Sequence, residues 1–241
     1  MKKEKIIYGL HAVAAALQNK NRNIHRVFAT KGAEEALLKT VKDPKCTILP
    51  KQKHEIAGML PEGAVHQGIA LECDSLPGVK LEDIINQAED KSVVMILDQV
   101  SDPHNIGAII RSTSSFGADA VIVQEKNSPE VTGLVAKIAC GGVEEAPLVR
   151  VVNLSRAIEK LQASGYWVVG LDERGKCELS QTGLEAGKIA IVLGAEGPGI
   201  RDLVLKKCDV LARIPMAEKS KVSSINVSNA AVVALYEFFR K

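Results

Sequence analysis

Continuous apolar runs are the feature that most constrains the fold of this chain. Residues 93–97, 120–123 and 189–193 contain only apolar side chains. A strand of this composition is buried on both faces, which is typical of a parallel sheet with helices packed on either side. Stretches with the 3.6-residue periodicity of helices separate the runs. The sequence therefore predicts an α/β protein built around a parallel sheet.

The chain divides into two parts on either side of a short linker. Residues 1–74 alternate short apolar runs with helix-like stretches, as in a small α/β unit. Residues 75–90 contain Pro77-Gly78, a pair typical of a linker, and a lead-in helix. Residues 91–241 form the larger predicted domain. Each part is long enough to bury a core of its own.

Local patterns place the individual elements. In the first part, we expect strands at residues 6–9, 27–29, 47–49 and 68–73, with helices at residues 10–17, 34–39 and 51–59. Beyond residue 80, we expect strands at residues 93–97, 120–123, 166–170 and 189–193, with helices at residues 81–87, 106–116, 154–164 and 225–239. Gly117 stands where a glycine commonly ends a helix.

The composition is that of an ordinary globular protein, with 46% hydrophobic and 25% charged residues. No apolar run reaches the roughly 18 residues that a membrane span needs, and no signal-like stretch follows the N-terminus. We therefore expect a cytoplasmic protein without a membrane segment. The five cysteines form no C-x-x-C pair and the five histidines show no ligand spacing, so we expect free thiols and no metal site.

Charge is distributed unevenly along the chain. Residues 1–76 carry 12 Lys and Arg against 8 Asp and Glu, a net charge of +4, although the whole chain carries only +2. An excess of positive charge in one small part is compatible with a partner that presents phosphates. An ordinary solvated surface explains the same excess equally well.

Three polar, glycine-marked segments follow predicted strands. They are residues 98–111, residues 194–199, and residues 214–216 together with 223–228. Ligand and catalytic groups gather at the carboxyl ends of strands in an open α/β sheet, so the three segments together predict a composite site. A dinucleotide-binding site is excluded, because the first segment lacks G-x-G-x-x-G and no acidic residue closes the next strand.

Taken singly, the polar residues of these segments have purely structural interpretations. Asn105 would cap a helix beginning at Ile106, and Ser224 would cap the last helix. Arg111 would form a surface ion pair. The remaining candidates of the first segment are turn formers or lack a visible partner, namely Asp98, Asp102 and His104.

Taken together, the three segments resemble a known family. Their patterns are Asn105-x-Gly107-x-x-x-Arg111, Gly194-x-Glu196-Gly197-x-Gly199, and Ile214-Pro215-Met216 followed by Ser224-Ile225-Asn226-Val227-Ser228. In this order, over residues 92–241, they resemble the three motifs of the SpoU/TrmH-type RNA ribose 2′-O-methyltransferases. Residues 8–13 and 64–70 are similar to the small substrate-binding domain of two-domain members. The resemblance therefore extends over both parts of the chain.

The resemblance implies a fold and an activity. The fold is a C-terminal parallel-sheet SPOUT domain with a trefoil knot, preceded by a small N-terminal α/β substrate-binding domain of ribosomal-protein-like fold. The activity is methyl transfer from S-adenosylmethionine to a ribose 2′-hydroxyl, with a guanosine of 23S rRNA as the implied substrate and a homodimer as the usual assembly. Two alternatives stay open: a tRNA or antibiotic-resistance rRNA site as substrate, or a non-catalytic RNA-binding or ribosome-assembly factor.

The resemblance also implies roles for single residues. Arg111 is the central catalytic residue. Because a guanidinium stays protonated, we expect it to grip an RNA phosphate and stabilise the developing alkoxide rather than act as a base. Glu196 is the expected proton acceptor, or the group that orients Arg111. The full catalytic set is Arg111, Glu196, Asn105, Ser224 and Asn226. The cofactor contacts are Gly194, Ile214, Met216 and Ile225. The RNA contacts are Tyr8, His66, Gln67, Lys20, Arg22 and Arg26, with Lys51 and Lys53 as further phosphate contacts.

The third segment departs from the family pattern. Residues 217–223 form a longer and more charged run than the short glycine-containing loop of the family, and Ile225 replaces the usual leucine. We expect this loop to become ordered only when cofactor or RNA binds.

Overall fold

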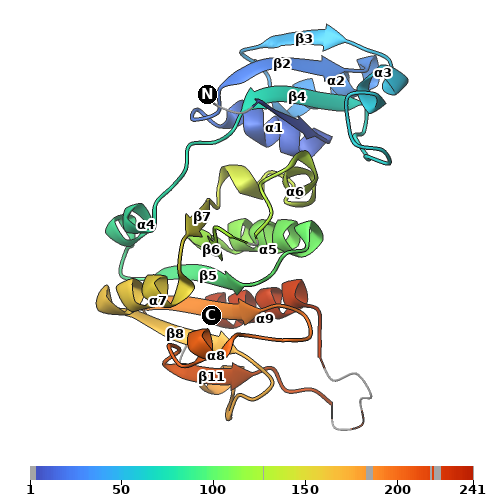
Figure 1. Cartoon of the computed structure of the whole chain (residues 1–241). Helices are drawn as coiled ribbons and strands as arrows, with labels where there is room; N and C mark the ends of the chain where they lie inside the picture. The colour runs from blue at the N-terminus through green and yellow to red at the C-terminus, as the bar shows by residue number, and fades with distance from the viewer. Residues whose placement is uncertain (1–3, 127, 183–186, 218, 220–223, 241) are drawn as a thin grey trace. The chain divides into compact units, whose positions relative to one another are not determined.

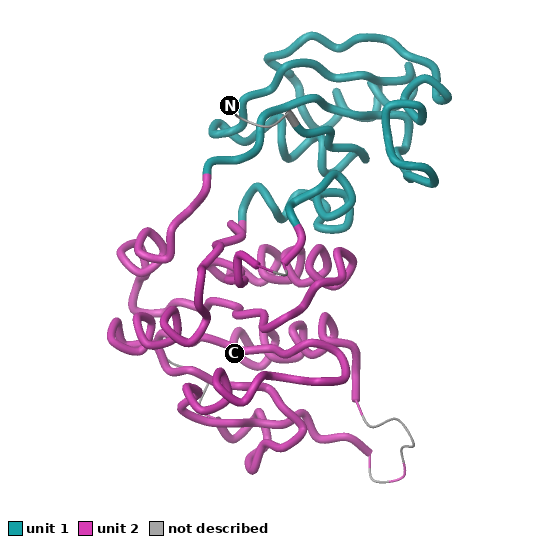
Figure 2. Tube along the Cα trace, viewed as in Figure 1, with its two compact units in different colours: residues 1–77, 130–145 teal, residues 78–129, 146–241 magenta. Residues whose placement is uncertain are grey.

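The structure is a computed structural model that describes residues 4–126, 128–182, 187–217, 219 and 224–240. It contains two compact units, formed by residues 1–77 with 130–145 and by residues 78–129 with 146–241 (Figure 2). Most of the loop over residues 217–223 lies outside the described residues, so its ordering on ligand binding stays a prediction.

A four-stranded sheet forms the centre of the first unit (Figure 1). Its order is β1 (Glu4–Tyr8), β4 (Ile69–Asp74), β2 (Ile24–Ala29) and β3 (Thr47–Pro50). β4 runs antiparallel to both β1 and β2, whereas β3 is parallel to β2. The helices are α1 (Leu10–Gln18), α2 (Lys31–Thr40), α3 (Lys53–Ala57) and α6 (Gly133–Ile138), followed by the 3-10 turn η1 (Gly142–Glu144). Every strand and helix expected over residues 6–73 is present, with ends shifted by a few residues.

Residues 130–145 pack in the first unit, although the predicted boundary at residue 91 assigned them to the larger domain. α6 lies against β1, and Gly133 leaves room for the Tyr8 ring, which a Cβ at that position would approach to 2.8 Å. Glu144 forms a buried ion pair with Arg22 and accepts a hydrogen bond from Asn19 at 2.7 Å. These partners lie 122 and 125 residues apart, so local sequence patterns do not reveal them.

The Arg22–Glu144 ion pair leads to a stability prediction. Only 4% and 5% of the two side-chain surfaces are exposed. Glu144→Ala leaves the Arg22 guanidinium buried without a counter-charge, so we expect the free energy of unfolding to fall by about 3–5 kcal/mol. Urea denaturation measures the change. The control is Glu159→Ala, which removes an exposed pair with Lys207 and costs at most about 1 kcal/mol. Equal losses in the two variants would contradict the prediction.

A parallel sheet of seven described strands forms the centre of the second unit (Figure 1). Its order is β7 (Leu148–Val151), β6 (Ala120–Gln124), β5 (Ser92–Asp98), β10 (Lys188–Gly194), β8 (Tyr166–Leu171), β11 (Val210–Arg213) and β9 (Cys177–Glu178). Every neighbouring pair is parallel, which confirms the predicted sheet type. The helices are α4 (Leu81–Gln87), α5 (Pro103–Phe116), α7 (Leu154–Ala163), α8 (Asp202–Leu205) and α9 (Val227–Phe239), with a 3-10 turn η2 (Leu179–Gln181).

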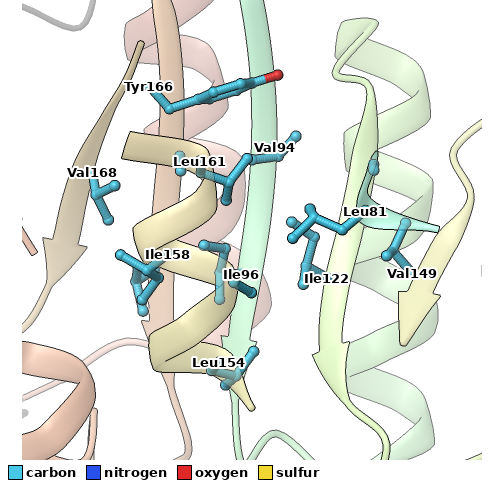
Figure 3. Close-up of a cluster of buried hydrophobic side chains, with 14 of the residues drawn as sticks. Leu81, Val94, Ile96, Ile122, Val149, Leu154, Ile158, Leu161, Tyr166 and Val168 are labelled. Carbon is cyan, nitrogen blue, oxygen red and sulfur yellow. The ribbon is translucent and has the colours of Figure 1, made fainter. Parts of the chain in front are cut away.

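Helix α7 supplies one layer of the core of this unit. Leu154, Ile158 and Leu161 recur at helical spacing and pack in one cluster with Val94 and Ile96 of β5 (Figure 3). Alternate residues of β5 point to the opposite face of the sheet. In the same unit, helices α5 and α9 pack against each other. Burial of every β5 residue explains why this strand appears in the sequence as one apolar run.

Short elements escaped the sequence prediction. β7, β11, α8 and α6 span only four to six residues each. A segment of that length contains about one period of a helix or two of a strand, so its pattern identifies some short elements, such as β3 and α3, and misses others.

The described part of the chain contains no helix long and apolar enough to cross a membrane, and no group of three potential metal ligands. The five cysteines form no disulfide. Burial raises the pKa of the Cys73 thiol to about 11 and that of the Cys208 thiol to about 12. Both thiols therefore stay protonated and unreactive at neutral pH.

Candidate active site

A pocket of about 800 Å³ opens at the carboxyl ends of β8, β10 and β11. It is lined by residues 171–174, 193–199, Ile214, Met216, 224–227 and Ala230. All four residues expected to contact the cofactor lie in this lining, namely Gly194, Ile214, Met216 and Ile225. The second and third polar segments therefore meet at one cavity, as the composite-site prediction requires.

A tight turn over residues 194–199 forms one wall of the pocket. The Gly199 N–H donates to the Ala195 carbonyl at 3.0 Å and closes the turn. Gly197 and Gly199 adopt φ of +86° and +68°, which side chains other than glycine tolerate poorly. A Cβ on Gly194 would overlap the backbone of Gly199 and Ile200. The glycines of this segment are therefore needed for close backbone approach and for the turn itself.

Three side chains, one from each polar segment, form a hydrogen-bonded triad beside the pocket. The Asn105 amide donates to Oε1 of Glu196 at 3.2 Å. The Asn226 amide donates both to the same Glu196 oxygen and to Oδ1 of Asn105, the latter at 3.0 Å. Asn105 is buried, whereas Glu196 is exposed. The Glu196 carboxylate is thus exposed to solvent, and the amides of Asn105 and Asn226 fix its orientation through hydrogen bonds.

Two of the structural alternatives for these residues are wrong. Asp102 caps α5 by accepting from the His104 N–H at 3.0 Å, so the helix begins at Pro103 and Asn105 lies inside its first turn. Pro at the first helical position favours this earlier start. Asn226, and not Ser224, caps α9, since its side chain accepts from the Ser228 N–H at 2.8 Å. Ser224 lines the pocket instead.

Both parts of the chain match families of known proteins. The sequence profile of the SpoU rRNA Methylase family matches residues 92–236, and the profile named RNA 2′-O ribose methyltransferase substrate binding matches residues 6–79. The chain belongs to the SpoU rRNA methylase family. The predicted resemblance is confirmed for both parts of the chain.

Relatives within the family match almost the full length. The 23S rRNA (guanosine-2′-O-)-methyltransferase RlmB of Pseudomonas putida is 38% identical over 98% of this chain and 96% of its own length. The RlmB of Escherichia coli is 37% identical, with 98% of each chain covered. Among solved structures, the SpoU methyltransferase AviRb from Streptomyces viridochromogenes in complex with AdoMet superposes with a TM-score of 0.80 at 23% identity, covering 97% of this chain and 88% of that one. This likeness establishes the SpoU fold.

Arg111, the expected central catalytic residue, lies apart from the triad. It follows Asn105 by six residues, which places it on a different side of α5. The Arg111 side chain is exposed and makes no hydrogen bond or ion pair with any described residue. Glu196 bonds to Asn105 and Asn226 instead, so the expectation that it orients Arg111 stays a prediction. The surface ion pair considered for Arg111 is not formed with any residue that the structure describes.

Asp172 and Arg174, just after β8, are pocket residues that the sequence reasoning missed. Arg174 donates from Nε and Nη2 to the two Asp172 carboxylate oxygens at 2.6 and 2.9 Å. This guanidinium holds the pKa of Asp172 below its usual range, so the carboxylate stays charged. Arg174 also donates to the Ile200 carbonyl at 3.3 Å, beside the turn over residues 194–199. The run Asp172-Glu173-Arg174 directly after an expected strand was the signal that could have identified them.

The residues expected to contact RNA separate into buried and exposed groups. Arg22 is buried and paired with Glu144, and it also donates to the Asp74 carbonyl at 3.1 Å. We therefore no longer count Arg22 among the RNA contacts. Lys20 and Arg26 are exposed, although Arg26 pairs with Glu72.

Tyr8 ends β1, and His66 and Gln67 lie in the turn that precedes β4. Tyr8 and His66 are buried, and burial lowers the pKa of His66, so its imidazole is neutral at physiological pH. Its Nδ1 accepts from the Gly68 N–H at 3.2 Å. Gln67 has a left-handed backbone, with φ of +56°, and its side chain accepts from the Leu10 N–H at 3.2 Å. The contacts described for these residues shape the first unit, and their contact with RNA stays a prediction.

Proposed function

We propose that this chain transfers a methyl group from S-adenosylmethionine to the ribose 2′-hydroxyl of a guanosine in 23S rRNA. The observation that carries the proposal is the convergence of three SpoU motif segments on the Asn105–Glu196–Asn226 triad beside a pocket. The choice of guanosine and of 23S rRNA rests on relatives that are 36–38% identical and bear that name.

The pocket fits the cofactor in size and chemistry. Its volume of about 800 Å³ is in the range of sites for ligands of nucleoside size. Leu193, Ile214 and Ile225 offer apolar contacts to a base, and the Glu196 carboxylate, which accepts only from two neutral amides among the described residues, favours a cationic ligand. When bound, S-adenosylmethionine supplies an electrophilic sulfonium methyl group.

The triad is suited to removing the proton of the attacking hydroxyl. Oε1 of Glu196 accepts from both Asn105 and Asn226, whereas no described residue donates to its Oε2. We assign the 2′-hydroxyl proton to Oε2 as the ribose oxygen forms its bond to the methyl carbon and the carbon–sulfur bond breaks. Asn105 and Asn226 fix the carboxylate for this transfer. Arg111, exposed on α5, grips the neighbouring RNA phosphate.

Glu196→Gln tests the proton acceptor. The amide retains the size of the side chain and still accepts hydrogen bonds through its oxygen, but it cannot take a proton. We expect kcat to fall by about 10²-fold, the lower range of general-base contributions. Single-turnover methyl transfer to RNA measures kcat. A variant that retains wild-type kcat would assign the proton to another group.

The knot, the homodimer and the cellular site are part of the same proposal. β10 lies between β5 and β8, and the chain returns so that α9 packs on α5, a course compatible with the trefoil knot of the family. Val232, Val233 and Tyr236 expose apolar surface on α9, which supports a self-association face. Light scattering decides between monomer and dimer. A substrate in ribosomal RNA favours a cytoplasmic enzyme.

Ribose-methylation mapping of total RNA distinguishes the proposal from its alternatives. Cells with and without the gene are compared at every 2′-O-methyl site. We expect loss of one 2′-O-methylguanosine in 23S rRNA. Loss of a tRNA site, or of a resistance-associated rRNA site, would support a different substrate of the same family. An unchanged map would favour the non-catalytic RNA-binding or assembly factor.

A further inference from the structure

Asp98 is a fully buried carboxylate at the end of β5. We expected it to be a turn former, but its two oxygens are held by one residue, Arg201. The backbone N–H of Arg201 donates to Oδ2 at 2.9 Å, and its Nε donates to Oδ1 at 2.8 Å. A buried charge is costly unless it is paired and hydrogen-bonded. The pairing with Arg201 therefore accounts for the presence of Asp98 in the core.

Arg201 connects the end of the pocket turn to two strand ends. Its backbone follows Ile200, two residues after the turn over residues 194–199. Its Nη2 lies 2.6 Å from Asp98 at the end of β5 and donates to Gln124 at the end of β6 at 2.9 Å. About 40% of the Arg201 side chain remains exposed. The Arg201 guanidinium thus connects the segment that follows the pocket turn to the ends of β5 and β6.

Both ends of the pocket turn are fixed at Asp98. Gly194, where the turn begins, is the register partner of Asp98 in the β10–β5 pair, and Arg201, two residues after the turn ends, bonds to the Asp98 side chain. The segment that leads to Asn105 starts at the same place, with Gln99 in a left-handed conformation at φ of +60°. The segments that carry Asn105 and Glu196 therefore both begin beside Asp98, and the two side chains are joined by a hydrogen bond of 3.2 Å.

We propose that Arg201 is a positioning residue for methyl transfer, which acts through Asp98 to hold Glu196 against Asn105 and against the pocket. This inference rests on the proposed function. It assigns Arg201 no contact with substrate or cofactor. Its importance comes from geometry, since a misplacement of about 1 Å at a reacting group costs on the order of 10²-fold in rate.

Paired variants separate positioning from mere stability. Arg201→Met leaves the Asp98 carboxylate buried without its cation, so the variant loses stability as well as geometry. Asp98→Asn combined with Arg201→Met removes the charge, and the asparagine oxygen still accepts the backbone N–H of residue 201. We expect the double variant to regain most of the melting temperature. We expect its kcat to stay about 10²-fold below wild type, and its Kd for S-adenosylmethionine, measured by calorimetry, to stay about tenfold higher. Recovery of kcat and Kd together with melting temperature would overturn the proposal.

A double-mutant cycle with Glu196→Gln tests the route of the effect. Once Glu196 is replaced, Arg201→Met is expected to lower kcat by less than about threefold, because the group that it positions is already altered. A further loss of about 10²-fold would show an independent action and would contradict the proposal. Arg201→Lys retains the positive charge but not the planar guanidinium group. We expect its kcat to lie between those of the wild type and Arg201→Met.

The matched control and the cofactor measurement keep the two proposals distinguishable. Lys207→Met removes a cation of the same unit whose ion pair with Glu159 is exposed, and we expect unchanged Kd, kcat and melting temperature. If the wild-type chain binds S-adenosylmethionine but methylates no 23S rRNA, the proposed substrate fails. The calorimetric Kd of Arg201→Met still tests positioning in that case, since an unchanged Kd would refute it.

Discussion

Gly194→Ala is expected to raise the Kd for S-adenosylmethionine by about 10²-fold or more and to remove detectable methyl transfer. The added Cβ falls on the backbone of Gly199 and Ile200, not on a flexible side chain that can rotate away. The turn must therefore open, which separates Glu196 from Asn105. Overpacking of this kind costs about 3 kcal/mol or more where backbone has to move, equivalent to about 10²-fold in affinity. Isothermal titration calorimetry measures the Kd.

Gly197→Ala is the matched control in the same turn. A Cβ at Gly197 meets nothing within 4 Å, although its φ of +86° disfavours alanine. Only the local strain of about 1–2 kcal/mol remains, so we expect at most about a thirtyfold rise in Kd. If Gly194→Ala binds the cofactor as well as Gly197→Ala does, the close approach of β10 to Gly199 is not what shapes the pocket.

Arg111→Lys is expected to lower kcat by about 10²–10³-fold while the Kd for S-adenosylmethionine stays unchanged. Lysine retains the charge but cannot form the planar, two-pronged contact with a phosphate. Arg111 lies outside the residues that line the pocket and contacts none of the triad, so cofactor binding does not depend on it. Rapid-quench methyl transfer at saturating RNA, together with calorimetry, gives the two quantities.

Arg156→Lys is the control for this substitution, since Arg156 is also an exposed helical arginine, on α7. We expect it to retain wild-type kcat. Substantial activity in Arg111→Lys would mean that the guanidinium fork is not required. A raised cofactor Kd would instead place Arg111 in the pocket.

The sequence allowed the sheet type and the convergence of the site to be predicted, because both depend on local patterns. Apolar runs mark buried parallel strands, and glycines mark turns at their ends. Ion pairs between distant positions were not predictable in this way. Asp98 with Arg201 and Arg22 with Glu144 join residues 103 and 122 positions apart, and each pair changed an expected role. Asp98 proved to be a buried anchor, and Arg22 a structural cation.

The helix caps show a second limit of local reasoning. Asn105 and Ser224 both have the side chains of cap residues, but Asp102 and Asn226 occupy those positions. Several residues near each helix start were able to cap it, and tertiary contacts selected between them. For Asn105, the competing partner was Glu196, which lies 91 residues away.

The packing of residues 130–145 with residues 1–77 has a consequence for exchanging substrate preference between relatives. The chain crosses between the two units three times, after residues 77, 129 and 145. A chimera that transplants only residues 1–77 would bring an Arg22 without its own Glu144 and a Tyr8 without its own Gly133. The first unit, which contains the match to the substrate-binding profile, is therefore a discontinuous module. Its specificity is expected to transfer only when both pieces are moved together.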